Sequence, residues 1–91
     1  MNLIWSPQSL EDRKQIYAFI FEHDNQATDA LDDLFDNQAN RLLTFSEMGK
    51  PGRIKGTREL VVHKHYLLVY ICSPDAIRVV TVLHTSRQYP A

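Results

Sequence analysis

The end of the chain, from His84 to Pro90, carries three side chains of the types that metal-independent cleavage of RNA uses. His84 can titrate near neutral pH and exchange a proton, Arg87 can pair with a phosphate, and the ring of Tyr89 can stack on a base. These residue types are also common in the tails of unrelated proteins, where they have structural roles. His84, Arg87 and Tyr89 are therefore the candidate catalytic residues, with a structural role as the alternative.

Four basic residues form a second candidate set, which would bind an anion or a macromolecular target: Arg53, Lys55, Arg58 and Arg78. The first two lie in a glycine-containing loop. In the strand register predicted below, Arg58, Ile71 and Arg78 form one row across three strands. Because a guanidinium grips carboxylate or phosphate in a fork, this row is a predicted anion site. The alternative is that these arginines pair with acidic side chains at the rim of the sheet.

Sequence patterns for metals and cofactors are missing. The single cysteine, Cys72, excludes a disulfide framework and the paired-cysteine zinc patterns, and its apolar neighbours predict a place in the core. His63 and His65 flank Lys64, but no third metal ligand is placed by spacing. There is no glycine-rich phosphate loop, nucleophile elbow or paired-carboxylate motif. We therefore expect no metal and no cofactor.

Charge is divided unevenly along a chain whose formal net charge is −1. Residues 1–46 hold eight acidic and three basic side chains, a net charge of −5, and residues 47–91 hold three acidic and seven basic ones, a net charge of +4. An anionic partner should therefore meet the second half. The acidic residues Asp29, Asp32, Asp33 and Asp36 fall off the apolar stripe of a predicted helix, so we expect them on a solvated face, with metal binding as the alternative.

The hydrophobic periodicity predicts one α+β domain over residues 1–91, with the element order β-α-α-β-β-β. The expected elements are a strand at 3–5, a helix from Ser9 to about His23 after a Ser6-Pro7 cap, a helix from Gln26 to about Ser46 after a new cap at 23–25, a loop at 47–57, and strands at 59–63, 66–72 and 77–84. The two helices should pack on one face of a small, mainly antiparallel sheet.

Turn residues predict the register of the last three strands. A turn centred on Pro74 and Asp75 pairs Ile71 with Arg78 and His65 with His84. A two-residue turn at 63–64 or 64–65 places Arg58 on the same face as Arg78. This face would also carry Leu67, Val69, Val80 and Val82, which leaves apolar surface for a partner to cover.

Apolar stretches in the chain are short. The longest, at 16–21 and 66–72, fall far below the roughly 18 residues that a membrane span requires. The first residues lack the basic and apolar regions of a secretory signal. We therefore expect a cytoplasmic protein that has no membrane partner.

Three separated segments carry a resemblance that covers the whole chain. They are Ile4-Trp5-Ser6-Pro7 at the start of the first helix, residues 52–62 with residues 66–70, and residues 79–90. In these segments, and in length and element order, the chain resembles the RelE/ParE toxins of bacterial type II toxin-antitoxin modules. The resemblance implies a toxin that inhibits growth and stabilises plasmids. It also implies a cognate antitoxin that wraps the toxin with its C-terminal segment and alone contacts operator DNA.

The family has two activities on one fold, so the fold does not decide between them. Residues 55–59 and 83–87 look more like the ParE branch, which poisons DNA gyrase and is not an enzyme, and the acidic helices favour the same branch. The alternative is the RelE branch, whose members are ribosome-dependent mRNA interferases, that is, metal-independent endoribonucleases that act on mRNA in the ribosome. In that case Arg53 and Lys55 correspond to the basic loop, and His84, Arg87 and Tyr89 to the catalytic residues.

Overall fold

The elements follow one another in the order β1-α1-α2-β2-β3-β4-β5 in the computed structural model, which describes residues 1–90. They are β1 (Asn2–Trp5), α1 (Pro7–His23), α2 (Asn25–Arg41), β2 (Lys50–Pro51), β3 (Arg58–His63), β4 (Tyr66–Cys72) and β5 (Ala76–His84). The strands form one sheet in the order β1-β5-β4-β3-β2. β1 is parallel to β5, and the other neighbours are antiparallel. The α+β class is confirmed, and the loop expected at 47–57 contributes the short edge strand β2.

Both helices begin at the caps that the sequence predicts. The hydroxyl of Ser6 accepts a hydrogen bond from the amide of Ser9 at 3.0 Å, and Pro7 follows as the first helical residue. The carboxylate of Asp24 accepts hydrogen bonds from the amides of Gln26 and Ala27. Asp24 therefore separates the two helices, as expected from the break at 23–25.

The second helix ends at Arg41, earlier than the expected end near Ser46. After Arg41 the amides of residues 42, 43 and 44 bond to carbonyls three residues back rather than four. These tighter turns carry Leu42 into the core, where it is fully buried. The apolar stripe continues through the turns, which is why periodicity alone extended the helix.

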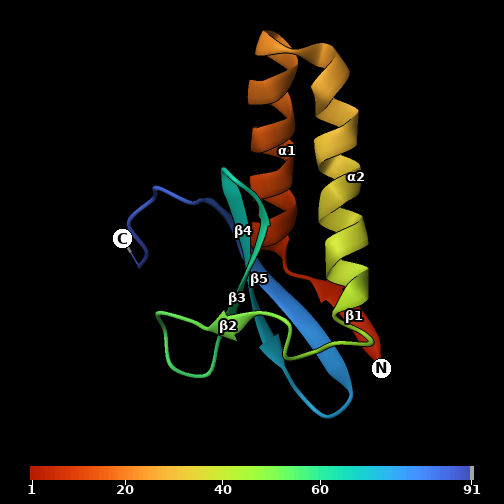
Figure 1. The fold of residues 1–91 in the computed structure, drawn as a ribbon, viewed down its shortest axis with the longest axis vertical. Helices are drawn as coiled ribbons and strands as arrows, with labels where there is room; N and C mark the ends of the chain where they lie inside the picture. The colour runs from red at the N-terminus through yellow and green to blue at the C-terminus, as the bar shows by residue number, and fades with distance from the viewer. Residues whose placement is uncertain (91) are drawn as a thin grey trace.

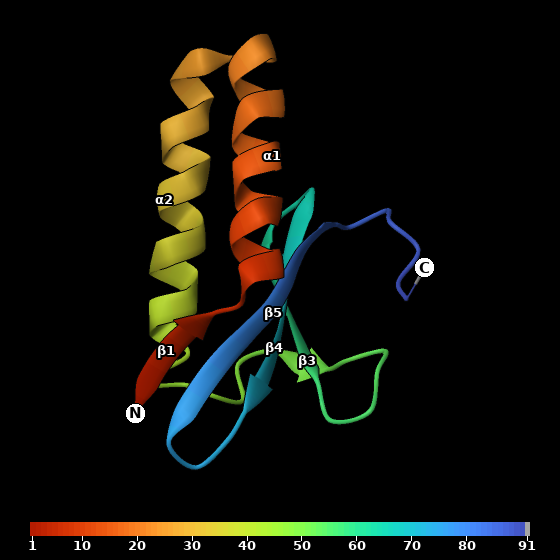
Figure 2. The ribbon, with the colours of Figure 1, turned by 180° about the vertical axis from the view of Figure 1, so that it is seen from behind.

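The helices form an antiparallel hairpin that packs on one face of the sheet at its base and extends past the sheet at its tip (Figure 1). The C-terminal tail lies on the other side of the sheet, as the reverse view also shows (Figure 2). Between helices and sheet, Phe35 and Ala39 of α2 and Leu42 just after it pack on apolar side chains of the strands: Leu60, Val62, Tyr66, Leu68, Tyr70, Ile77, Val79 and Val82. A second, smaller cluster on the outer face joins Leu67, Val69 and Leu83 to Val80 and Tyr89.

A bulge changes the register between β4 and β5. Near the turn Ile71 pairs with Arg78 as predicted, but beyond Tyr70 the β5 strand contains an extra residue, Val80. His84 therefore pairs with Tyr66 and not with His65, so the predicted pairing of the two histidines is wrong. An inserted residue shifts every later side chain to the other face, because side chains alternate along a strand.

The register between β3 and β4 also differs from the prediction. Arg58 pairs with Tyr70, and an extra residue at Val62 precedes the pair formed by His63 and Tyr66. Arg58 therefore lies on the helix side of the sheet with Tyr70, whereas Arg78 lies on the outer face with Ile71. The predicted row of Arg58, Ile71 and Arg78 is wrong.

The apolar residues predicted to be uncovered on the outer face are not exposed, although Val61 and Ile71 on the same face are. Leu67 and Val69 are buried there, and Tyr89 of the tail packs against their cluster. Val82 belongs to the core under the helices instead. The large exposed apolar side chains of the helix hairpin lie on α1, namely Leu10, Tyr17, Phe19 and Phe21.

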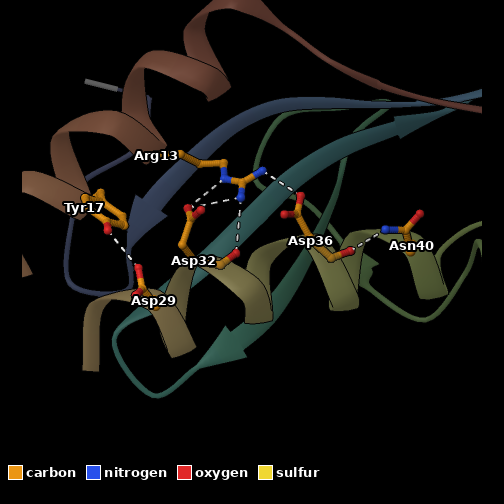
Figure 3. Close-up of polar contacts among 6 residues, drawn as sticks. All are labelled: Arg13, Tyr17, Asp29, Asp32, Asp36 and Asn40. Atoms are coloured by element: carbon orange, nitrogen blue, oxygen red, sulfur yellow. Dashed lines mark hydrogen bonds and ion pairs between the residues drawn. The ribbon is translucent and has the colours of Figure 1, made fainter. Parts of the chain in front are cut away.

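Acidic side chains of α2 form the seam between the helices (Figure 3). The guanidinium of Arg13, on α1, binds the carboxylates of Asp32 at 3.1 Å and Asp36 at 2.8 Å and lies over the ring of Trp5. Tyr17 donates a hydrogen bond to Asp29 at 2.7 Å. Asp29 is exposed, and the side chains of Asp32 and Asp36 are 35% and 50% exposed, so the acidic face is solvated in part as expected, and it also pairs with basic and hydroxyl groups of α1.

Candidate functional site

A polar clasp holds the C-terminal tail against the outer face of the sheet. The amide and guanidinium of Arg53 donate to the carboxylate of Glu59, with the closest guanidinium distance 3.1 Å. The same guanidinium donates to the carbonyl of Arg87 at 3.3 Å and lies 5.9 Å from the ring centre of Tyr89. We call Arg53, Glu59 and Tyr89 the tail clasp. Glu59, which the sequence offered as an alternative partner of Arg58 or Arg78, is therefore paired with Arg53 instead.

The clasp shifts the ionisation of its acid. Glu59 is only 3% exposed. Its pKa lies below the ordinary value because Arg53 donates hydrogen bonds to the carboxylate, an effect that exceeds the opposing effect of burial. Glu59 is therefore a charged, paired group in the fold, and Arg53 is committed to it.

The other three basic candidates lie apart from one another. Arg58, on the helix side, donates to the carbonyl of Gly49 at 2.7 Å and lies 3.9 Å from Glu47. Lys55 is exposed in the loop before β3, and Arg78 is exposed on the outer face. Within residues 1–90, neither of the last two forms an ion pair. Lys55 and Arg78 are therefore the candidates whose charges are available to a partner.

The three candidate catalytic residues are divided between two sides of the sheet. His84 and Arg87 border one shallow depression next to α1. Tyr89 packs on the outer face against the cluster that contains Leu67 and Leu83. The fold therefore brings His84 and Arg87 together but separates the stacking ring from them.

All four histidines of the chain line one groove, a feature that sequence reasoning missed. The groove has a volume of about 670 Å³ and lies between the distal half of the helix hairpin and the end of the sheet. Its apolar wall is Phe19, Ile20, Ala27, Ala30, Leu31 and Leu34, and its polar wall is His23, His63, His65 and His84, with Tyr66 and Asp24. We call it the histidine groove.

Three of the histidine rings lie side by side at the end of the sheet. The rings of His65 and His84 are stacked with centres 5.4 Å apart, and those of His63 and His65 are 5.6 Å apart. The predicted proximity of His65 and His84 is therefore confirmed, although their pairing is not. Partial desolvation, together with the positive charges of Lys64, His84 and His63, lowers the pKa of His65.

Hydrogen bonds assign the protons of the neutral rings. Nδ1 of His63 accepts from the amide of His65, and Nδ1 of His84 accepts from the amide of Ser86, each at 3.1 Å. In the neutral state both rings therefore carry their proton on Nε2. In His23, by contrast, Nδ1 lies 2.8 Å from the carbonyl of Phe19, so this nitrogen donates.

Possible metal ligands are dispersed in residues 1–90, and the single cysteine is exposed. No three histidine, cysteine, aspartate or glutamate side chains there are arranged to hold a metal ion. Cys72, expected in the core, is exposed at the end of β4, and its thiol donates to the carbonyl of Ser46. Desolvation raises the pKa of this thiol, so it stays protonated near neutral pH. Across the same residues no helix is both long and apolar enough to span a membrane.

Comparison with known proteins identifies the family. The family model for the ParE toxin of the type II toxin-antitoxin system parDE matches residues 3–89. The chain belongs to this family. The toxin is 32% identical to Y4kP, a proposed toxin of Sinorhizobium fredii, over 87 residues that cover 94% of this chain and 90% of the relative.

Solved structures confirm the fold of the toxin. A chain of the chromosomal ParDE system of P. aeruginosa aligns with a TM-score of 0.82 at 16% identity, covering 92% of this chain and 95% of that one. The YoeB dimer of Staphylococcus aureus aligns with a TM-score of 0.65 at 14% identity over 91% and 94% of the two chains. The YoeB/ParE toxin of Agrobacterium tumefaciens gives 0.55 at 24% identity over 92% and 98%. Membership of a toxin-antitoxin family implies a cognate antitoxin.

Proposed function

We propose that this toxin poisons DNA gyrase in the cytoplasm and is silenced by its cognate antitoxin, which alone contacts operator DNA. In this proposal residues 1–91 act as one domain that stops growth by binding and cleaves nothing itself. Lys55 and Arg78 contribute to the target-binding surface because they are exposed and bear uncommitted positive charge.

One observation carries the choice against cleavage. General acid–base chemistry on a phosphodiester needs a proton-transfer group, a phosphate clamp and a positioned base within hydrogen-bond reach of one reacting centre. Tyr89 packs on the outer face, whereas His84 borders the depression beside α1. Arg53, the first cation of the basic loop, is committed to Glu59. This arrangement favours a binding protein over a nuclease.

The test is a comparison of transcripts and DNA after a brief induction of the toxin, with a co-expressed antitoxin as the control. Gyrase poisoning should block replication and induce the SOS response while mRNA stays intact. Purified toxin should inhibit supercoiling by gyrase in vitro. New mRNA ends within minutes, with supercoiling unaffected, would overturn the proposal.

A charge reversal tests the proposed target-binding surface. Lys55→Glu and Arg78→Glu should each weaken gyrase inhibition several-fold while the melting temperature is unchanged, because both side chains are exposed. Lys14→Gln, an exposed change on α1, is the matched control. Full inhibition by the double variant Lys55→Glu/Arg78→Glu would remove these residues from the target-binding surface.

Ribosome-dependent mRNA cleavage is the second candidate, because His84 and Arg87 border the same depression. Here the partners are the ribosome and mRNA, and His84, Arg87 and Tyr89 are the catalytic residues. Alanine at any of the three should then lower the cleavage rate on the order of 100- to 10,000-fold. If the toxin poisons gyrase, the same variants produce no change in mRNA ends.

A further inference from the structure

Two turns meet at the end of the sheet, and a histidine ring closes each of them. In the β3–β4 turn, Nδ1 of His63 accepts a hydrogen bond from the amide of His65 at 3.1 Å. At the start of the C-terminal tail, Nδ1 of His84 accepts from the amide of Ser86, also at 3.1 Å. Both bonds use the lone pair of a neutral ring, and a protonated ring has no free lone pair on this nitrogen. Protonation therefore removes both acceptors.

Thr85 joins the two turns. Its amide donates to the carbonyl of His65 at 2.8 Å, and its hydroxyl donates to the carbonyl of Lys64 at 3.1 Å. The chain then turns again, because the amide of Arg87 donates to the carbonyl of His84 at 3.0 Å. The first residues of the tail are thus held at these two turns, and the tail clasp holds the far end.

The rings that close the turns also pack against one another. The ring centre of His65 lies 5.6 Å from that of His63 and 5.4 Å from that of His84. Positive charges on neighbouring rings at this spacing repel each other. After desolvation, the same repulsion contributes to the lowered pKa of His65. A protonated cluster therefore weakens the contact between the two turns in addition to removing the acceptors.

Few groups near the rings can offset this charge. Lys64 is exposed in the β3–β4 turn, and Arg87 borders the neighbouring depression. Of the acids, Asp24 caps α2, and Asp12 already accepts hydrogen bonds from β5. The phenol of Tyr66 stays neutral, because desolvation raises its pKa. In the described part of the chain none of the ion pairs includes a histidine.

His23 faces the same groove from α1 but makes a different hydrogen bond. Its Nδ1 donates to the carbonyl of Phe19 at 2.8 Å. A protonated ring carries a hydrogen on both nitrogens, so this bond survives proton uptake. His23 is therefore a groove histidine whose protonation releases no backbone group.

The hydroxyl of Ser86 limits the effect at His84. It lies 2.7 Å from the same Nδ1 atom and donates to the neutral ring. When the ring is protonated, the direction of this bond reverses and Nδ1–H donates to the hydroxyl oxygen. The bond from the amide is lost in either case, so protonation loosens the turn without unfolding the sheet.

We propose that His63 and His84 are pH-sensitive latches, which hold the β3–β4 turn and the start of the C-terminal tail while they are neutral and release both on protonation. Imidazoles change charge between about pH 5 and 8, so the latches open as the pH falls through this range. The tail clasp stays closed there, because the hydrogen bonds from Arg53 lower the pKa of Glu59. The acid form is a folded toxin whose tail is anchored by the clasp alone. The inference is independent of whether the target is gyrase or the ribosome.

The experiment follows the free, complete toxin by NMR at pH 7.5 and pH 5.0. It measures the protection of single amides, which is the exchange rate with water relative to that of an unstructured peptide at the same pH. Protection of the His65 and Ser86 amides should fall about fivefold at pH 5.0, the equivalent of one hydrogen bond. The amide of Leu68, in the buried centre of the sheet, should change less than about twofold. Unchanged protection at the two turns, or an equal fall at Leu68, would overturn the inference.

Substitutions separate the latches from the other groove histidine. In His63→Asn/His84→Asn the amide oxygens can still accept both backbone hydrogen bonds, but they do not titrate. Protection of the two turn amides in this variant should differ by less than about twofold between the two pH values. His23→Gln, the matched control, should retain the fall seen in the wild type. A fall of wild-type size in the double variant would contradict the proposal.

His84→Ala gives the converse test, because it removes the acceptor of the tail latch at every pH. Backbone order parameters of residues 86–88 in this variant should lie below about 0.6 already at pH 7.5 and match those of the wild type at pH 5.0. The fold itself is checked by the protection of Leu68. A tail in His84→Ala that is as ordered at pH 7.5 as in the wild type would show that the ring does not hold it, and would overturn the inference.

Discussion

Polar side chains are paired on the outer face of the sheet but face solvent on the helix side, at the end of the sheet. On the outer face the tail clasp ties Arg53 to the buried Glu59, and Tyr89 packs on apolar side chains. On the helix side the histidine groove leaves four imidazoles facing open space beside exposed apolar residues. Residue types that suggest chemistry therefore stabilise the fold on one side, and on the other they are available to a partner. Arg53 is therefore committed within the fold, whereas Lys55 and Arg78 carry charges that form no ion pair within residues 1–90.

Removal of the clasp arginine should have the largest effect on stability. Arg53→Ala leaves the carboxylate of Glu59 buried without its partner, which should lower the free energy of unfolding by about 3 kcal/mol. Urea unfolding followed by circular dichroism measures this. The double variant Arg53→Ala/Glu59→Gln should recover part of the loss, because no buried charge remains. A loss under about 0.5 kcal/mol in the single variant would mean that the clasp is weak and Arg53 is available for binding.

A substitution in the seam between the helices should have the second largest effect on stability. Arg13→Ala removes ion pairs to Asp32 and Asp36 and a contact with Trp5, and should destabilise the fold by about 2 kcal/mol. Although burial opposes its charge, hydrogen bonds and attraction from Asp36 and Asp32 raise the pKa of Arg13. Lys14→Ala, the exposed neighbour, is the control and should change the urea midpoint little.

The stability that the tail clasp contributes should be lost in acid. Because the pKa of Glu59 in the fold is below its ordinary value of about 4.5, the clasp stabilises the protein above that pH. This stability is lost as the pH falls through the lowered value, since the folded carboxylate must then take up a proton. Melting temperatures between pH 6 and 3 should therefore drop less steeply in Glu59→Gln than in the wild type. Parallel curves would contradict the assigned pairing.

Substitutions in the histidine groove should have the smallest effect on stability. His63→Asn and His84→Asn change exposed or half-buried rings and should alter the free energy of unfolding by no more than about 0.5 kcal/mol. Thermal melts of the variants and the wild type measure this change in stability. A large loss of stability would show that these histidines stabilise the fold as the clasp residues do, and would contradict the difference between the two sides of the sheet.

Local signals predicted most of the fold. Ser6-Pro7 and Asp24 mark the helix starts through their own hydrogen bonds, and Pro74 predicts the turn that pairs Ile71 with Arg78. The bulges at Val62 and Val80 carry no such signal, because both residues are ordinary β-branched strand formers.

Each bulge changed the predicted site. The one-residue shift moved Arg58 away from Arg78 and paired His84 with Tyr66, and long-range packing placed Tyr89 on the other face. The groove could be anticipated in part, since the predicted turn already brought His65 near His84. His23 joins them only because the helix hairpin extends past the sheet, and this depends on how the hairpin docks.

The parallel pairing of β1 with β5 has a consequence for the timing of folding during translation. Residues 2–5 can find their partner only after residues 76–79 have been synthesised, because β1 lies at the edge of the sheet beside β5 alone. At about 5 to 20 residues per second, this interval lasts about 4 to 14 s. The helix hairpin is a local unit and can form earlier, whereas the sheet closes last. The edge strand β1 therefore joins the sheet only after the final strand is available, although it is the first element of the chain.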